Sequence, residues 1–361
     1  MIRLLIVDDS PLMRKLLTDI FAAESDFEVG VARNGPEALA ALPVFKPDVI
    51  TLDIHMPEMD GLACLDRIMV ERPCPVVMIS SLTAEGADET LEAMALGAVD
   101  FVAKPRGPVS IEIEAMTSLL VDKVRAAARA RISRATRLTE RVRLRTTRPP
   151  APKPRPTRLS QTNKPRVSGG DEGLVLVGTS TGGPAALDVL LGQIPADFPW
   201  PIVIAQHMPA SFTGALARRL DRFCPLVIEE VTRPTPLIAG HAYIGRGDAD
   251  LLVTRRNGAL AALPAPSAPE LHWHPSVDRL VTSAMDHVAP ERLIGVLMTG
   301  MGADGAKAMT ALAGRGGLTI AEAEESAVVW GMPGSLVAMG GADHVVPLDA
   351  IAGRLMSLIQ P

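Results

Sequence analysis

Short, unbroken apolar runs that alternate with helical patterns constrain this chain more than any other feature. In the first third of the sequence these runs are residues 4–7 (LLIV), 48–53 (DVITLD), 76–80 (VVMIS) and 100–104 (DFVAK). Strands without polar alternation are covered on both faces, which is typical of a parallel sheet lying between helices. The pattern therefore predicts a doubly wound α/β domain.

The segment between the first two runs has the signals of a helix. Ser10 is suited to the N-cap and Pro11 to the first helical position. Apolar residues then recur with helical spacing and predict one buried face, made of Met13, Leu16, Leu17 and Ile20.

The same alternation returns in the second half, with runs at 174–177, 201–205 and 293–298. The helix expected after the first of these has one apolar face, formed by Leu187, Leu190, Leu191 and Ile194. Asn257-Gly258 is a strong hairpin turn signal and predicts an antiparallel insertion. The whole chain is therefore expected to fold into two doubly wound parallel-sheet domains, the second of them Rossmann-like.

A strongly basic segment separates the two blocks. Residues 124–167 hold 14 Lys/Arg and one acid, a net charge of +13. Because the net charge of the whole chain is −5, the remaining residues carry −18. The segment has no aromatic residue and contains RPPAPKPRPTR. Such a composition is typical of a flexible linker. We predict domains at 1–123 and 171–361, joined by a basic Pro/Arg-rich linker at 124–170.

Composition also indicates the compartment. The three cysteines are an odd number without metal-ligand spacing, which suits a reducing cytosol. Asp8 and Asp9 come too early for a signal-peptide core, and no apolar run reaches the roughly 18 residues of a membrane helix. A cytoplasmic protein without membrane insertion is expected.

Polar residues follow the buried runs of the first domain, at the strand ends where open parallel sheets bind ligands. They are Asp8, Asp9, Asp53, Ser80 and Lys104. Two carboxylates ~4 Å apart repel by about 4 kcal/mol at an effective dielectric of ~20. A divalent cation removes this cost, and oxygen ligands favour Mg²⁺. Asp53 is then the predicted nucleophile toward a phosphoryl donor, with Lys104 and Ser80 contacting the phosphoryl oxygens.

The motifs IVDDS, TLDIHMPEMDG, MISSLT and DFVAKP make residues 1–123 resemble a response-regulator receiver domain. The resemblance implies that a histidine kinase phosphorylates Asp53 and that Phe101 occupies the aromatic switch position. It also implies a set of Mg²⁺ ligands, namely Asp8, Asp9, Asp53 and the backbone carbonyl of His55. An acidic residue is common in that family where His55 stands here.

The stretch GTSTGG, residues 178–183, permits several kinds of turn. It lacks the Lys-Ser/Thr of a P-loop and the glycine spacing of a dinucleotide-binding turn. It fits the G-x-S-x-G pattern that exposes a nucleophile, here Ser180, between a strand and a helix.

A serine nucleophile needs a base and an orienting acid. His207 follows the run at 201–205, and Asp304 follows the run at 293–298. The order Ser, His, Asp differs from that of α/β-hydrolases. By composition alone other histidines compete for the role of base (His241, His272, His274 and His287), and Asp304 alternatively caps the next helix.

The motifs VGTSTGGP, AQHMPASFTGALARRL, HPSVDRL, TGMGADGA and SAVVWGMPGS resemble the catalytic domain of chemotaxis protein-glutamate methylesterases, the CheB family. The resemblance implies Ser180 as nucleophile, His207 as general base and acid, and Asp304 as orienting carboxylate. It also implies a backbone amide of Met301 in the oxyanion hole and Thr181 lining the site. In HWHPSVD, Trp273 stands where that family more often has histidine.

The implied reaction is phosphorylation-regulated hydrolysis of glutamate γ-methyl esters on chemoreceptors, with methanol released and no cofactor for the hydrolysis. Some members of the family also deamidate receptor glutamine. The implied partners are methyl-accepting receptors as substrate and a chemotaxis-type histidine kinase as phosphodonor. Two alternatives stay open: a receiver-controlled scaffold without catalysis, and a nucleic-acid regulator that uses the basic linker. No helix-turn-helix pattern supports the second, so nucleic acid is not the expected partner.

Overall fold

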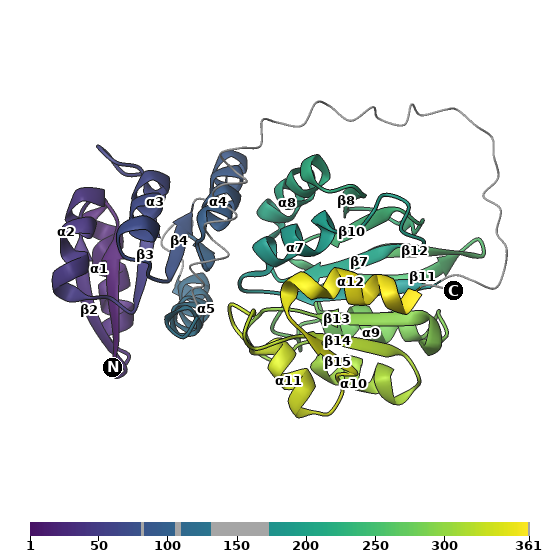
Figure 1. Ribbon diagram of the computed structural model, residues 1–361. Coiled ribbons are helices and arrows are strands. Elements are labelled where there is room, and N and C mark those ends of the chain that lie inside the picture. Colours follow the sequence, from purple (N-terminus) through teal and green to yellow (C-terminus); the bar gives the residue numbers. More distant parts are fainter. Residues whose placement is uncertain (81–82, 105–109, 131–172, 360–361) are drawn as a thin grey trace.

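The computed structural model describes residues 1–80, 83–104, 110–130 and 173–359, which form two sheet-containing domains (Figure 1). Most of the segment predicted as a linker, residues 131–170, lies outside the described residues. Its first residues continue helix α5 (Ser110–Ala128) across the predicted boundary at residue 123.

The first domain alternates strands with helices along the chain. Its strands are β1 (Ile2–Val7), β2 (Phe27–Ala32), β3 (Val49–Asp53), β4 (Val76–Ser80) and β5 (Asp100–Ala103). Its other helices are α1 (Pro11–Ala22), α2 (Gly35–Phe45), α3 (Gly61–Glu71) and α4 (Ala84–Leu96). All strand pairs are parallel, in the order β2-β1-β3-β4-β5. Strands β2 and β3 lie on opposite sides of β1, so the strand order reverses at β1. Sheets of this kind bind ligands at such a reversal, here beyond the carboxyl ends of β1 and β3.

Helix α1 begins as its sequence predicts, and its predicted apolar face lies against the core, although most of that face is only partly buried. The Ser10 hydroxyl accepts a hydrogen bond from the amide of Met13 (3.3 Å), and Pro11 opens the helix. The fully buried residues are Leu17 and Phe21, whereas the other predicted core positions are only partly buried. Met13 and Ile20 pack against the same apolar cluster, and Phe21 extends the buried face by one turn, packing on Phe27 with ring centroids 5.0 Å apart.

The second domain is built on a larger parallel sheet. Its strands are β6 (Leu174–Thr179), β7 (Ile202–Gln206), β8 (Val227–Val231), β10 (His241–Gly245), β13 (Leu293–Leu297), β14 (Leu318–Glu322) and β15 (His344–Val346). Its helices are α7 (Gly183–Gly192), α8 (Ala210–Phe223), α9 (Val277–Met285), the 3-10 turn η1 (Pro290–Arg292), α10 (Ala306–Gly314), α11 (Met332–Ala338) and α12 (Leu348–Ile359). The strand order is β15-β14-β13-β6-β7-β10-β8, so the strands before the three predicted site residues (β6, β7 and β13) are neighbours at its centre.

A small antiparallel sheet is formed by segments on either side of β10, and it contains the hairpin that the turn signal predicts. It contains β9 (Thr235–Pro236), β11 (Ala249–Arg256) and β12 (Ala259–Pro266). Arg256 pairs with Ala259, so Asn257 and Gly258 form a two-residue turn with φ values of 51° and 84°. Positive φ at both positions is what a tight hairpin turn requires.

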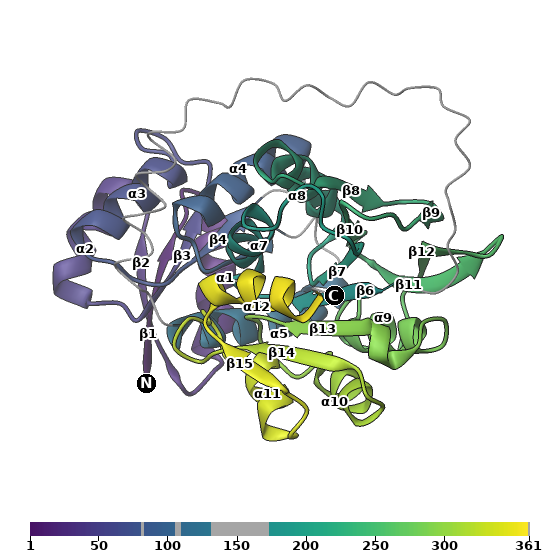
Figure 2. The same cartoon turned by 45° about the vertical axis from the view of Figure 1, so that its right-hand side comes forward.

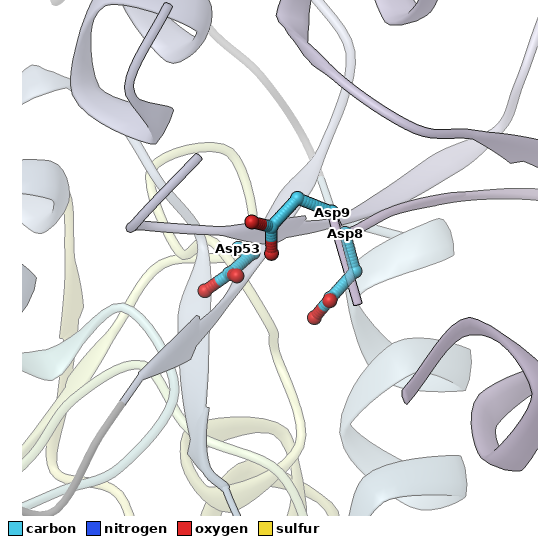
Figure 3. Close-up of side chains that lie close together, drawn as sticks. All are labelled: Asp8, Asp9 and Asp53. Atoms are coloured by element: carbon cyan, nitrogen blue, oxygen red, sulfur yellow. The ribbon is translucent and has the colours of Figure 1, made fainter. Parts of the chain in front are cut away.

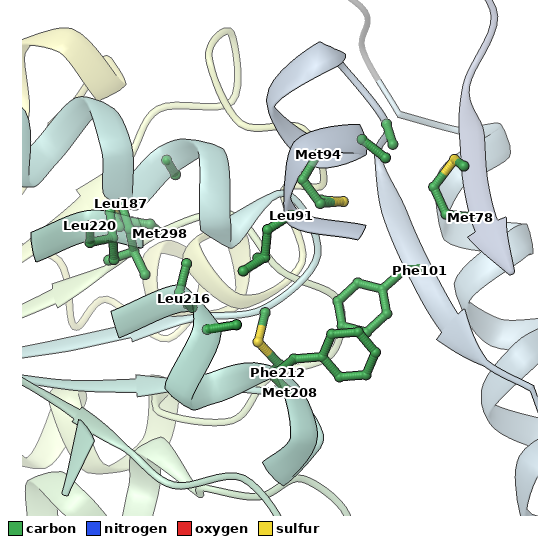
Figure 4. Packing of buried hydrophobic residues seen from close by; sticks show 14 of the residues in the cluster. Met78, Leu91, Met94, Phe101, Leu187, Met208, Phe212, Leu216, Leu220 and Met298 are labelled. Carbon is green, nitrogen blue, oxygen red and sulfur yellow. The ribbon is translucent and has the colours of Figure 1, made fainter. Parts of the chain in front are cut away.

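The two domains pack directly on each other (Figure 2). Helix α4 of the first domain contacts α7 and α8 of the second. One cluster of buried apolar side chains runs through this junction and includes Leu91 and Met94 on α4, Phe101 on β5, and Phe212 and Leu216 on α8 (Figure 4). Burial of such surface is the main favourable contribution to domain association.

Within the described residues, every helix is too short or too polar to cross a membrane.

Candidate functional site

The structure brings together the carboxylates predicted to surround a phosphorylated aspartate. Asp53 ends β3, and Asp8 and Asp9 follow β1, its neighbour in the sheet. Carboxylate oxygens of the three residues lie within 4.8 Å of one another (Figure 3). Lys104 follows β5, and its Nζ lies 2.8 Å from Asp53 and 3.3 Å from Asp8. The three carboxylates offer only hard oxygen donors, so they fit Mg²⁺.

The electrostatics of this cluster agree with that fit. Burial raises the pKa of Asp8, and the neighbouring charge of Asp53 raises it further, with Lys104 acting against both. Burial alone would lower the pKa of Lys104, but its hydrogen bonds and proximity to Asp53 and Asp8 raise it overall. Added positive charge at this site would therefore stabilise the ionised carboxylates.

The other predicted receiver residues lie nearby but make different contacts. Ser80 ends β4 and is buried, and its hydroxyl accepts a hydrogen bond from Thr90 on α4 (2.6 Å). The imidazole of His55 lies 3.1 Å from Glu89, also on α4. Phe101 packs on Phe212 of the second domain, with ring centroids 4.4 Å apart. Ser80 and Phe101 thus connect the carboxylate cluster to the elements that meet the second domain.

The serine-containing turn lies between β6 and α7 and is tightly held. Ser180 is 5% exposed, and its amide donates to the carbonyl of Thr299 (3.0 Å). Glycine is required at the two positions after Thr181. Gly182 has φ +78°, which other residues rarely adopt, and a Cβ on Gly183 would lie 2.0 Å from the side-chain amide oxygen of Gln206. That Gln206 donates to the carbonyls of both Ser180 and His207, each at 3.0 Å. The nucleophile turn and the histidine loop are therefore tied together.

His207 pairs with Asp304, as the order of the strand ends predicts. The imidazole Nε2 lies 2.8 Å from Oδ2 of Asp304, and both side chains are almost fully buried. The imidazole Nδ1 is buried and, among the described residues, makes no hydrogen bond. Because a neutral imidazole carries one proton, a hydrogen donated from Nε2 leaves the lone pair on Nδ1. Nδ1 is thus the nitrogen that could accept a proton.

Asp304 is held by the start of helix α9. It accepts hydrogen bonds from the amides of Val277 (2.7 Å) and Asp278 (3.0 Å) and from the hydroxyl of Ser276 (3.1 Å). Burial acts to raise the pKa of Asp304, but the hydrogen bonds from His207 and these amides lower it below its usual value. The carboxylate therefore stays ionised and keeps one orientation.

The remaining predicted residues surround this pair. The backbone of Gly300 approaches Ser180 closely, since a Cβ there would lie 2.7 Å from the serine Cβ, and Met301 follows it. Thr181 is buried, and its hydroxyl donates to Asp100 of the first domain, while its carbonyl accepts from Thr299 Oγ1 (2.9 Å). Met301 also borders a cavity of about 360 Å³ that is lined as well by Arg129, just beyond α5.

The competing histidines have other partners. His274 is bonded to Asp250 (2.9 Å), His241 stacks on Tyr243, and the backbone carbonyl of His287 accepts from Arg255. His272 meets the edge of Trp273. Within the described ranges, only His207 has both the acid partner and a place beside the Ser180 turn.

Sequence reasoning missed several side chains of this site. Gln206 precedes the predicted base directly, yet nothing in its local sequence indicates a bridging role. Asp100 lies 81 residues from its partner Thr181. Trp273 stacks on the His207 ring, with centroids 5.4 Å apart and planes at 8°. Of the three, only Trp273 carried a signal, because it departs from the resembled motif.

Comparison with known proteins agrees with this geometry. Residues 175–355 match the protein family described as CheB methylesterase, and residues 4–114 match the response regulator receiver domain. A relative from Rhodopseudomonas palustris (strain BisB18), named protein-glutamate methylesterase/protein-glutamine glutaminase 2, is 55% identical over 99% of this chain and 98% of its own length. One from Rhodospirillum rubrum, with the same name and number 3, is 53% identical over 98% of this chain and 95% of its own.

A solved structure resembles the second domain alone. The CheB methylesterase catalytic domain of Thermotoga maritima is 37% identical, with a TM-score of 0.50. It covers 52% of this chain and 98% of that protein's chain.

Proposed function

Because this chain belongs to the CheB methylesterase family and carries a response regulator receiver domain, we propose that it hydrolyses glutamate γ-methyl esters of chemoreceptors. The products are a receptor glutamate side chain with a free γ-carboxylate, and methanol. The names of its relatives support a second reaction at the same site, the deamidation of receptor glutamine. The observation that carries the proposal is the buried His207–Asp304 pair beside the Ser180 turn.

In the proposed mechanism, Ser180 is the nucleophile. Its Oγ forms a bond to the ester carbonyl carbon while Nδ1 of His207 accepts the hydroxyl proton. The bond to the methoxy group then breaks, and the same nitrogen returns the proton so that methanol leaves. Water repeats the sequence on the acyl-enzyme and restores Ser180. Asp304 stabilises the imidazolium that forms twice in each cycle.

The negative oxygen of each tetrahedral intermediate needs hydrogen-bond donors that are already in place. We assign this role to the backbone amide of Met301, because the Gly300 backbone lies against Ser180. We also assign Thr181, the next residue after the serine, to the lining of this site. Its hydroxyl is engaged with Asp100, so this part of the site depends on the first domain.

The first domain receives the phosphoryl group in this proposal. Asp53 attacks the phosphorylated histidine of a chemotaxis-type kinase, and Lys104 pairs with the transferred group. Mg²⁺ would be held by Asp8, Asp9, Asp53 and the His55 carbonyl, and it would neutralise charge on the entering phosphoryl oxygens. Both the kinase and the receptor substrate are expected to meet the protein in the cytoplasm, where its three free cysteines stay reduced.

Contacts between the domains support control of hydrolysis by Asp53. The carbonyl of Val99 accepts a hydrogen bond from the Gly182 amide (3.2 Å), directly after the nucleophile turn. Asp100 binds Thr181, and Phe101 packs on Phe212. Val99, Asp100 and Phe101 lie on or beside β5, the strand that leads to Lys104. Movement of Lys104 toward a phosphoryl group would therefore disturb the contacts that cover the serine.

Methanol release from methylated receptor membranes tests the proposed function. The wild-type protein with Mg²⁺ and beryllofluoride should release methanol, and Ser180→Ala should reduce the rate by several orders of magnitude. If the chain were instead a scaffold without catalysis, the Ser180→Ala variant would keep its function. Equal release by the wild type and Ser180→Ala would overturn the proposal.

A further inference from the structure

The segment between β12 and α9 contains His272, Trp273 and His274, and the proposed mechanism uses none of them. Trp273 is half-buried, and its indole lies parallel to the His207 imidazole. A centroid separation of 5.4 Å with planes at 8° is an offset stack, one of the arrangements that aromatic pairs prefer. Trp273 therefore contacts the proposed general base through its ring face.

The residues around Trp273 hold it in this position. His274 is bonded to Asp250 (2.9 Å), which also accepts from the Ser276 amide (2.8 Å). On its other side, His272 meets the indole edge-on, with ring centroids 4.6 Å apart. The indole Nε1 lies 3.5 Å from where a Cβ on Gly302 would sit, so the ring also reaches the turn that follows Met301. The indole thus lies between the base and the proposed oxyanion turn.

His207 needs such a support. Its ring is fixed by one hydrogen bond, from Nε2 to Asp304, and its Nδ1 makes none within the described part of the chain. A ring held at one nitrogen can still tilt about that contact, which would move Nδ1. A flat neighbour restricts the tilt. A tryptophan face also stabilises a cation more than other aromatic faces do, and the imidazole is cationic after each proton transfer.

We propose that Trp273 is a positioning residue of the hydrolytic reaction, whose indole holds the His207 ring in its reactive plane and stabilises the imidazolium. The inference rests on the proposed function, because it requires His207 to be the base. It assigns a role to a side chain that touches the base and not the reacting atoms.

Other charged groups face this pair and must stay constant in the test. They are Asp304, bonded to the imidazole; Asp278 on α9; Lys307 on α10; and His272, which borders the same cavity of about 320 Å³ as Trp273. Asp250, His274 and Arg279 form the network behind the loop. Substitutions of Trp273 leave all of these groups in place, so a comparison between two such variants isolates the ring face.

The kinetic test compares Trp273→Phe with Trp273→Leu in the full-length protein, activated with Mg²⁺ and beryllofluoride. We expect Trp273→Leu to lower kcat for methanol release about tenfold, which corresponds to about 1.4 kcal/mol, with KM nearly unchanged. The acidic limb of its kcat/KM profile should shift to lower pH, because the cation loses a stabilising face. Trp273→Phe should recover most of kcat and the position of the limb.

A fluorescence titration gives a readout that needs no substrate. A protonated imidazole quenches a stacked indole, so the emission difference between wild type and Trp273→Phe should fall when acid protonates His207. His207→Gln should abolish this change. His272→Gln is the matched control, because it removes the other imidazole in contact with the indole, and it should preserve the change.

Several outcomes would overturn the inference. One is an unchanged kcat and pH profile in Trp273→Leu; another is a rise in KM alone, which would make Trp273 a substrate-contacting wall. Equal losses in the Phe and Leu variants with an unmoved acidic limb would also contradict it, as would a quench that persists in His207→Gln. Failure of the proposed function is separate: the wild type would then release no more methanol than Ser180→Ala, whatever Trp273 does.

Discussion

Replacing Phe212 by alanine should activate the unphosphorylated full-length protein. Phe212 lies on α8 and is fully buried, and its ring meets Phe101 of the receiver at 4.4 Å with planes tilted by 45°. If these rings help to hold the receiver over Ser180, truncating one of them weakens the closed arrangement without touching the proposed triad.

The size of the effect follows from the contact. An aromatic pair contributes ~0.5–1.5 kcal/mol beyond its buried area. Burying a whole phenylalanine side chain is worth about 1.5–3 kcal/mol, of which only the part facing the receiver counts here. A loss of about 1 to 2 kcal/mol from the closed state would raise the open population, and the basal rate, roughly fivefold to thirtyfold. The rate of the freely open enzyme is the upper limit.

The assay is methanol release from methylated receptor membranes without phosphodonor. The matched control is the same substitution in a fragment of residues 169–361, which has no receiver and should show no gain. Phe101→Ala combined with Phe212→Ala should activate less than the sum of the single effects, because both remove one contact. The reasoning is refuted if Phe212→Ala speeds the fragment as much as the whole chain. It is also refuted if the fragment is folded yet no faster than the unphosphorylated full-length protein.

Three further predictions concern single carboxylates. Asp53→Asn should abolish the labile acyl-phosphate formed from acetyl phosphate and Mg²⁺ while leaving basal methanol release intact; undiminished phosphate incorporation would disprove the assignment. Asp304→Asn should keep the thermal unfolding midpoint within a few degrees but lower kcat by about 10⁴, because the histidine then carries its proton on the wrong nitrogen; near-normal turnover would require another acid. Burial raises the pKa of Glu322 from 4.5 to about 7, with the Thr299 amide and the Ser326 hydroxyl only partly opposing the shift. A raised carboxyl pKa makes the folded state bind more protons, so this group's contribution to the free energy of unfolding should fall between pH 4.5 and 7 and stay level above. Glu322→Gln should therefore gain about 2 to 3 kcal/mol relative to wild type between pH 5 and pH 8 in denaturant unfolding, and a pH-independent difference would contradict the mechanism.

The sequence by itself determined the architecture and most of the candidate site. Unbroken apolar runs predicted parallel strands, and parallel strands bring their carboxyl ends to one edge, so Asp8, Asp53 and Lys104 were expected together before any contact was known. The hairpin at Asn257-Gly258 was predicted for an equally local reason, the need for positive φ. The face of α1 was predicted less well, because helical spacing gives a stripe and only packing decides that Leu17 and Phe21 lie at its centre.

Tertiary structure alone decided how these groups are oriented and controlled. No local pattern indicates that His207 turns Nε2 toward Asp304 and leaves Nδ1 free to accept a proton, since that choice depends on amides of α9 some 70 residues away. The stacking of Trp273 and the contact of Asp100 with Thr181 likewise join segments that are distant in sequence. Sequence periodicity reports which face of an element is buried, whereas contacts between elements depend on how whole domains pack. For that reason the reactive residues could be predicted from the sequence, but their supports could not.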